Sequence, residues 1–174
     1  IPTDLSKYDR KYEYLADSDL SDLNDHDDEF KFYFIGELNI RKNLSSLIIA
    51  FNREFKEQDN VRLILKLNQQ GKDSSDTIHE ALNMINSVKK QMGMYSDMSR
   101  YKTEIVITEF LSENDLYSLH QKCQCFVTAS SGEAFCIPAF DAVGFGSRVI
   151  VNENSSMVAY LDDHEYLIQS HGVA

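Results

Sequence analysis

The chain has few of the residues that break or loosen a backbone: two prolines and seven glycines among 174 residues. No Pro- or Gly-rich stretch divides it, so the sequence shows no flexible linker between domains. No apolar run approaches the roughly 18–20 residues that cross a bilayer, and IPTDLSKYDRKYEY at the start lacks the basic and apolar regions of a signal peptide. With 43% hydrophobic residues, the length suits one domain with a sizeable core.

Basic residues are also scarce, since 17 Lys and Arg stand against 28 Asp and Glu. Phosphate backbones and anionic lipids attract clustered Lys and Arg, so we expect neither nucleic acid nor direct membrane contact for this domain. Seven of the acids lie between Asp17 and Glu29. An EF-hand loop needs Gly at its sixth and Glu at its twelfth position. Counting from Asp17 or Asp19 gives neither, which favours a solvated acidic segment over a metal site.

Three cysteines, Cys123, Cys125 and Cys136, are odd in number and lack the spacing of zinc ligands. The five histidines are scattered along the chain. We therefore expect free thiols, no metal site and a reduced, cytoplasmic location.

Apolar periodicity predicts alternating strands and helices. Strands are expected at 29–36, 61–67, 103–110, 123–130, 147–152 and 165–168, and helices at 43–55, 74–93, 112–121 and 137–146, with a helical turn at 155–161. Ser74 or Ser75 and Gly93 are expected to cap the second helix, and Ser112 opens a capping box with Asp115. This order predicts an α/β fold, a Rossmann-like parallel sheet flanked by helices.

Ligands of such sheets bind beyond the carboxyl ends of the strands. This rule selects two loops, GELNIRKN after the first strand and SSGEAFCIPAFDAVGFG (130–146) after the fourth, which should face one crevice. Unpaired N–H groups at a helix start favour phosphate, and Pro138 suits the first helical turn. Glu133 and Asp141 can accept hydrogen bonds from sugar and ribose hydroxyls, while Arg41 and Lys42 supply cations. Together they describe a nucleotide-sugar site.

The ordered motifs resemble the C-terminal, donor-binding domain of GT-B glycosyltransferases of the group 1 (family 4) type. IPTDLSKY resembles the linker into that domain, and FIGELNIRKNLSSLIIAF resembles its first strand, glycine, Arg-Lys pair and helix. LSENDLYSLHQKCQCFVTASSGEAFCIPAFDAVGFGSRVIVN resembles the region that carries the family's E-x7-E motif. The resemblance covers nearly the whole chain except the acidic stretch and the second helix. It implies that the sheet is one half of a GT-B fold.

The resemblance also implies residue roles. Lys42 would hold the donor diphosphate, with Arg41 beside it, and Glu133 would contact the sugar hydroxyls. Asp141 would hold the ribose hydroxyls. The remaining substrate-binding positions would lie in the two loops: Gly36, Ala134, Phe135, Cys136 and Ile137, with the backbone amides of 134–136 facing the phosphates.

Each of these positions also has a purely structural interpretation. Lys42, Glu133 and Asp141 could be surface charges. Ser130 and Ser131 could serve first as turn formers, and Phe135 could pack in the loop rather than stack on a base.

Three departures from the family pattern stand out. Glu37 replaces the arginine that follows the strand-one glycine, and Asp141 is one methylene shorter than glutamate. Ala134 and Cys136 replace glycines, so this loop tolerates fewer backbone conformations. Both altered donor specificity and a weakened site are compatible with these changes.

The resemblance predicts the donor-binding domain of a retaining glycosyltransferase that uses a nucleotide diphosphate-sugar and needs no cofactor or metal. Two alternatives stay open: a GT-B epimerase or phosphorylase, and a degenerate, non-catalytic binding module. We expect residues 1–28 to be a linker-like acidic segment and 29–174 to be the donor domain, cut short at its C-terminus. The N-terminal acceptor-binding domain would be missing, so we expect the chain alone to bind donor weakly and to transfer nothing.

Overall fold

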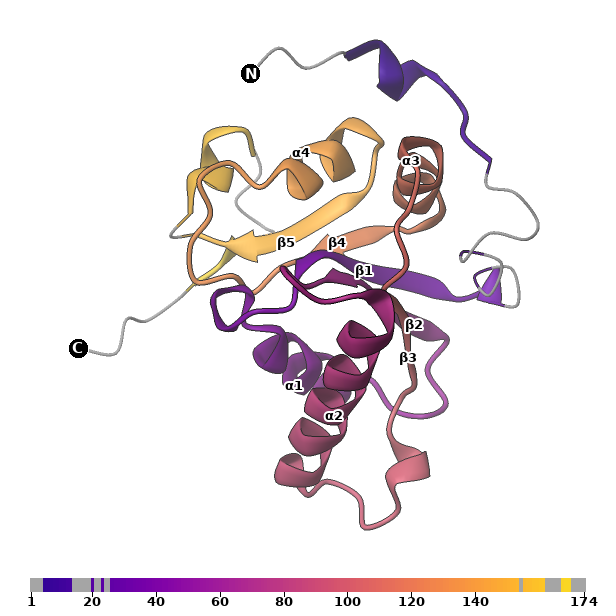
Figure 1. The fold of residues 1–174 in the computed structure, drawn as a ribbon, viewed down its shortest axis with the longest axis vertical. Helices are drawn as coiled ribbons and strands as arrows, with labels where there is room; N and C mark the ends of the chain where they lie inside the picture. Colours follow the sequence, from indigo (N-terminus) through magenta and orange to yellow (C-terminus); the bar gives the residue numbers. More distant parts are fainter. Residues whose placement is uncertain are drawn as a thin grey trace.

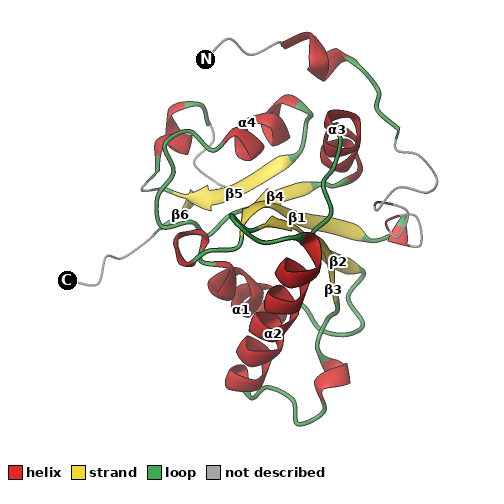
Figure 2. Ribbon diagram, in the orientation of Figure 1, coloured by secondary structure: helices red, strands yellow, loops and turns green. Residues whose placement is uncertain are grey.

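Six parallel strands form one twisted sheet in the computed structural model, which describes residues 5–13, 20, 23, 26–153, 155–161 and 167–169 (Figures 1 and 2). The strand order is β3-β2-β1-β4-β5-β6, and every neighbouring pair is parallel. The strands are β1 (Phe30–Glu37), β2 (Val61–Asn68), β3 (Glu104–Ile107), β4 (Cys125–Val127), β5 (Arg148–Asn152) and β6 (Leu167–Ile168). The predicted Rossmann-like α/β fold is confirmed.

Helices cover both faces of the sheet (Figure 2). They are α1 (Leu44–Glu54), α2 (Ser74–Met92), α3 (Glu113–Lys122) and α4 (Ile137–Gly144), with short 3-10 turns η1 (Leu5–Asp9), η3 (Ile40–Lys42), η4 (Met98–Arg100) and η5 (Ser156–Ala159). Side chains alternate across a strand. Tyr33 accordingly packs with Leu119 of α3 and Ala139 of α4, whereas Phe34 packs with Leu47 and Ile48 of α1. Each face therefore has its own apolar core.

Two strands are shorter than the sequence predicted, and polar side chains form hydrogen bonds where each strand ends. The strand expected at 103–110 ends at Ile107, after which Thr108 bonds to Ser74 at 2.8 Å. The strand expected at 123–130 spans Cys125–Val127, and the N–H of Ser130 then donates to the Thr128 hydroxyl. The chain leaves the sheet early at the edge where ligands of this fold bind.

Helix caps agree with the sequence at two positions and differ at one. Ser112 caps α3 by accepting a hydrogen bond from the N–H of Asp115, and Gly93 ends α2 with a φ of 59°. The predicted serine cap of α2 is wrong, because Asp73 accepts the N–H of Asp76 instead. Ser74, the first residue of the helix, uses its hydroxyl to hold the β3–α3 loop.

Some sequence predictions lie outside the described residues. These are the acids at 17, 19, 22 and 25 and the first half of the strand expected at 165–168. Within the described part of the chain, no helix combines the length and apolar character needed to cross a bilayer.

Candidate functional site

Lys42, Arg41 and Glu133 meet at the carboxyl edge of the sheet. The strands before them, β1 and β4, are direct neighbours, so the loops that follow lie side by side. Lys42 Nζ lies 2.6 Å from Glu133 Oε1, and Arg41 contacts the same oxygen at 3.0 Å. The sequence predicted that these residues share one crevice, and the structure brings them together.

The β1–α1 loop positions Lys42 through its local conformation. The side chain of Asn39 caps the 3-10 turn η3 by accepting the N–H of Lys42 at 3.1 Å. Asn43 then adopts a left-handed conformation, φ 50°, before α1 begins. Gly36 lies beside the lysine, and a Cβ there would collide with the Phe34 ring at 2.7 Å while making an ordinary contact with Lys42 Cε at 3.4 Å. Gly36 therefore allows the close packing of Phe34 beneath the loop and offers the site no polar side chain.

Hydrogen bonds tie the two loops to each other. The carbonyl of Arg41 accepts the N–H of Ser131 at 2.9 Å and the hydroxyl of Ser130 at 3.2 Å. In return, the Arg41 guanidinium donates to the Gly132 carbonyl at 2.6 Å. Ser130 and Ser131 therefore act as loop ties, and the Lys42–Glu133 pair is held from both sides.

Three further residues support the β4–α4 loop, and the sequence reasoning missed them. Asn152, at the end of β5, donates to the Ser130 carbonyl at 2.8 Å, and Ser156 of η5 donates to the Glu133 carbonyl at 2.8 Å. The hydroxyl of Tyr160 donates to the Phe135 carbonyl at 2.9 Å. No sequence signal identifies such contacts, because each residue lies more than 20 positions from its acceptor.

The start of α4 leaves backbone N–H groups without acceptors. Cys136, its N-cap residue, has a φ of 59° and makes no side-chain cap bond. Glycine adopts this left-handed conformation freely, whereas a residue with a Cβ is strained in it. Cys136, which replaces a glycine of the family pattern, therefore makes this turn less favourable. Within the described chain, the N–H groups of residues 134–137 donate to no acceptor. With the helix dipole behind them, they form a region that favours an anion.

Other loop side chains have packing roles. Phe135 contacts the rings of Phe140 and Tyr160 at centroid distances of 5.2 and 5.3 Å, which supports its interpretation as loop packing. Ala134 and Ile137 are exposed at the mouth of the loop, Ile137 by 55%.

Glu133 carries its negative charge in a partly enclosed position. Burial acts to raise the pKa of its carboxyl, but hydrogen bonds and charges, led by Lys42 and with Arg41 contributing, outweigh burial and hold the pKa below its ordinary value. Its side chain is only 8% exposed. At neutral pH the site therefore contains two cations that share one carboxylate oxygen.

Asp141 points toward a different part of the chain. Its Oδ1 accepts hydrogen bonds from Lys7 Nζ and from the Tyr8 hydroxyl, both at 2.7 Å. The residue is 4% exposed, covered by the N-terminal segment, residues 5–13. The sequence analysis expected the whole loop of residues 130–146 to face the crevice, whereas this carboxylate bonds to the N-terminal segment. Its ribose-binding role stays a prediction.

The remaining sequence candidates behave as local structural residues. Glu37 accepts a hydrogen bond from the Asn39 side chain at 2.8 Å. Cys123, Cys125 and Cys136 are buried free thiols, as predicted, and burial raises the pKa of each. Among the described residues, no group of three or more His, Cys, Asp or Glu is arranged to hold a metal ion.

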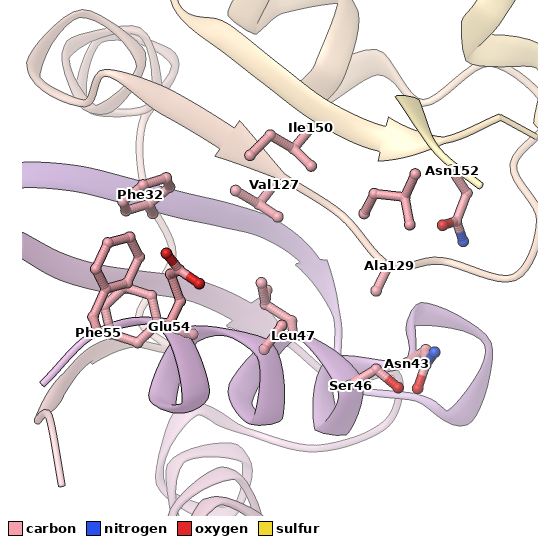
Figure 3. A pocket seen from close by; sticks show the side chains of 13 residues that line it. Phe32, Asn43, Ser46, Leu47, Glu54, Phe55, Val127, Ala129, Ile150 and Asn152 are labelled. Atoms are coloured by element: carbon pink, nitrogen blue, oxygen red, sulfur yellow. The ribbon is translucent and has the colours of Figure 1, made fainter. Parts of the chain in front are cut away.

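A cavity of about 510 Å³ adjoins this site between α1 and the sheet, with Asn43, Ala129 and Asn152 in its lining (Figure 3). Leu47 of α1 and Phe55, which follows the helix, face Phe32, Val127 and Ile150 of the strands across it. Its walls are almost entirely apolar, so it does not suit a highly charged ligand. The cluster around Lys42 is the better candidate site.

Comparison with known proteins places these observations in a family. The family model described as "Glycosyl transferases group 1" matches residues 17–173. The chain is similar to the C-terminal domain of the group 1 glycosyl transferase LpcC from Francisella tularensis, with 18% identity and a TM-score of 0.63, over 97% of this chain and 80% of that one.

Two longer proteins contain a similar domain. HepE from Anabaena, solved in complex with UDP-glucose, is 17% identical with a TM-score of 0.64, over 97% of this chain and 41% of that one. A UDP-forming α,α-trehalose-phosphate synthase from Burkholderia xenovorans is 11% identical with a TM-score of 0.64, over 84% of this chain and 34% of that one. The chain thus spans about a third of the synthase. No curated protein sequence matches it.

Proposed function

Because the chain belongs to the group 1 glycosyltransferases, we propose that it is the donor-binding domain of a retaining enzyme that uses a nucleotide diphosphate-sugar. The observation that carries the proposal is the convergence of Lys42, Arg41 and Glu133 beside the uncapped start of α4. Retention at the anomeric carbon rests on the family resemblance. UDP-glucose is the first donor to test, because it is named in the HepE structure.

The cations and amides suit the charge that develops during transfer. Cleavage of the bond between the sugar and the diphosphate leaves negative charge on the departing diphosphate. Lys42 would neutralise it at close range, Arg41 would assist from a half-exposed position, and the N–H groups of 134–137 would donate to its oxygens. Loss of one such preorganised donor typically costs about 10²–10³ in rate.

Glu133 has two successive partners in this proposal. Without donor, its carboxylate pairs with Lys42 and Arg41. When diphosphate takes those cations, Glu133 becomes free to accept hydrogen bonds from sugar hydroxyls. Donor binding would therefore replace the Glu133 carboxylate with diphosphate as the partner of Lys42, and Glu133 would bond to the sugar instead.

Substitution of Lys42 tests the assignment. In the full-length protein, Lys42→Ala should lower transfer about 10²-fold or more and weaken UDP binding, as measured by product formation and by calorimetry. Lys56→Ala is a matched control, because Lys56 is exposed and follows α1 at the opposite edge of the sheet. Unaltered transfer and donor affinity in the Lys42 variant would show the assignment to be wrong.

Transfer needs more than this domain. The chain spans 34–41% of the synthase and HepE chains that share its fold, and an acceptor site would come from an N-terminal domain. We expect residues 1–174 to bind donor without transferring sugar. A degenerate binding module is the second candidate, favoured by the occupied carboxylate of Asp141; it predicts no measurable affinity for any nucleoside diphosphate.

A further inference from the structure

The N-terminal segment, residues 5–13, runs alongside α3 and α4 (Figure 1). Aromatic side chains pack it there. The ring of Tyr8 lies against Phe145 at a centroid distance of 4.9 Å, and the ring of Tyr12 lies 5.0 Å from that of Tyr117. A Cβ on Gly144 would collide with the Tyr8 ring. The missing side chain of Gly144 thus creates the surface on which Tyr8 rests.

Side chains of α3 also hold the backbone of the segment. Gln121 accepts the N–H of Tyr12 at 2.9 Å and donates to the carbonyl of Arg10 at 2.6 Å. Asn114 donates to the carbonyl of Glu13 at 2.7 Å. Because the Gln121 side chain bonds to both an N–H and a carbonyl of the segment, it fixes the path of the backbone on α3.

The docked segment covers the carboxylate of Asp141. Lys7 Nζ and the Tyr8 hydroxyl both bond to Oδ1, and the Asp141 side chain is only 6% exposed. Lys7 also lies 5.0 Å from the centroid of the Tyr117 ring, which anchors its charge over α3. A ribose hydroxyl must approach a carboxylate oxygen to about 2.7 Å, and Lys7 and Tyr8 occupy that approach.

We propose that Lys7 and Tyr8 are specificity-determining residues, which form a latch that closes the Asp141 side of the site and competes with the nucleoside of the donor. The inference rests on the proposed function, in which Asp141 is the acid for the ribose. Diphosphate, held by Lys42 and Arg41, can bind with the latch closed. A nucleoside that bonds to Asp141 must first displace Lys7 and Tyr8.

The competition has a thermodynamic consequence. A ligand that binds only the open state loses apparent affinity by the fraction of molecules that are open. A nucleoside that bonds to Asp141 replaces the latch contacts with contacts of its own, so only part of their strength is lost to it. Removal of both latch contacts should therefore tighten nucleotide binding by about tenfold or more. Pyrophosphate, which has no ribose, should not respond.

Calorimetry with UDP and with inorganic pyrophosphate tests the latch. The variant Lys7→Met/Tyr8→Phe removes both bonds to Asp141 and keeps the apolar packing of the segment. We expect UDP to bind about tenfold more tightly and pyrophosphate to bind within twofold of wild type. Lys11→Met, which removes a charge from an exposed position of the same segment, should change neither affinity.

Hydrogen exchange gives a second readout on the unaltered protein. The N–H of Tyr12, bonded to Gln121, should exchange faster when UDP is added and should not respond to pyrophosphate. If pyrophosphate binds and the variant Lys7→Met/Tyr8→Phe has the same ratio of UDP to pyrophosphate affinity as wild type, the latch is wrong but the proposed function stands. Selective weakening of UDP would also overturn it, because Lys7 and Tyr8 would then assist the ribose-binding acid. Absence of binding by either ligand would overturn the proposed function and this inference together.

Discussion

Removal of the negative charge of Glu133 should make the site bind pyrophosphate more tightly, although Glu133 is itself a residue of the proposed site. Its Oε1 lies 2.6 Å from Lys42 and 3.0 Å from Arg41, so an incoming diphosphate must displace it. Glu133→Gln keeps the shape of the side chain and removes its charge. Both cations then become available to the ligand.

The expected gain in affinity follows from the solvent exposure of the Lys42–Glu133 and Arg41–Glu133 ion pairs. The Lys42 side chain is 11% exposed, and a charged hydrogen bond in such a position is worth about 1.5–3 kcal/mol. Arg41 is 48% exposed, and a pair at that exposure contributes roughly 0–1 kcal/mol because solvent and salt screen it. The lysine term dominates, so we expect pyrophosphate to bind about 10- to 100-fold more tightly to Glu133→Gln.

Calorimetry with pyrophosphate, UDP and UDP-glucose tests this reasoning. The gain for pyrophosphate should shrink at high salt, and the preference for UDP-glucose over UDP should fall because the sugar loses a charged acceptor. Glu57→Gln, which removes one exposed acid at the opposite edge of the sheet, controls for net charge. A Glu133→Gln affinity for pyrophosphate within twofold of wild type would refute the reasoning, as would an equal gain in the Glu57 variant.

Two further predictions concern the fold around the site. Gly36→Ala places a Cβ 2.7 Å from the Phe34 ring and should cost about 1–3 kcal/mol of stability, measured by urea unfolding. A wild-type free energy of unfolding would contradict the packing role of Gly36. Burial lowers the pKa of His120 from 6.5 to about 4. Between pH 6.5 and pH 4 the imidazole is therefore protonated in the unfolded state and neutral in the folded state. The free energy of unfolding should therefore fall by roughly 3 kcal/mol as the pH drops from 6.5 to 4, whereas His120→Gln should remove this part of the slope, and an unchanged slope would be contrary evidence.

Much of the fold could be predicted because its signals are local. Alternating apolar residues in 61–67 and the helical spacing of Leu44, Leu47, Ile48 and Phe51 depend on neighbours within one or two turns. Chain order and the rule for parallel sheets then placed the loops after β1 and β4 at one edge. Lys42 and Glu133, 91 positions apart, could therefore be assigned to one crevice without coordinates, although not to a pair with each other.

The tertiary structure decided what those side chains contact. No periodicity connects Lys7 and Tyr8 with Asp141, more than 130 positions away, and their bonds depend on the docking of the N-terminal segment, in which Tyr8 packs against Gly144. The support from Tyr160 likewise depends on how η5 returns toward α4. The sequence by itself determined which elements form and which loops share an edge, because local periodicity and strand order set both. Only the folded chain decided which charges are paired, because pairing depends on distances that sequence separation does not encode.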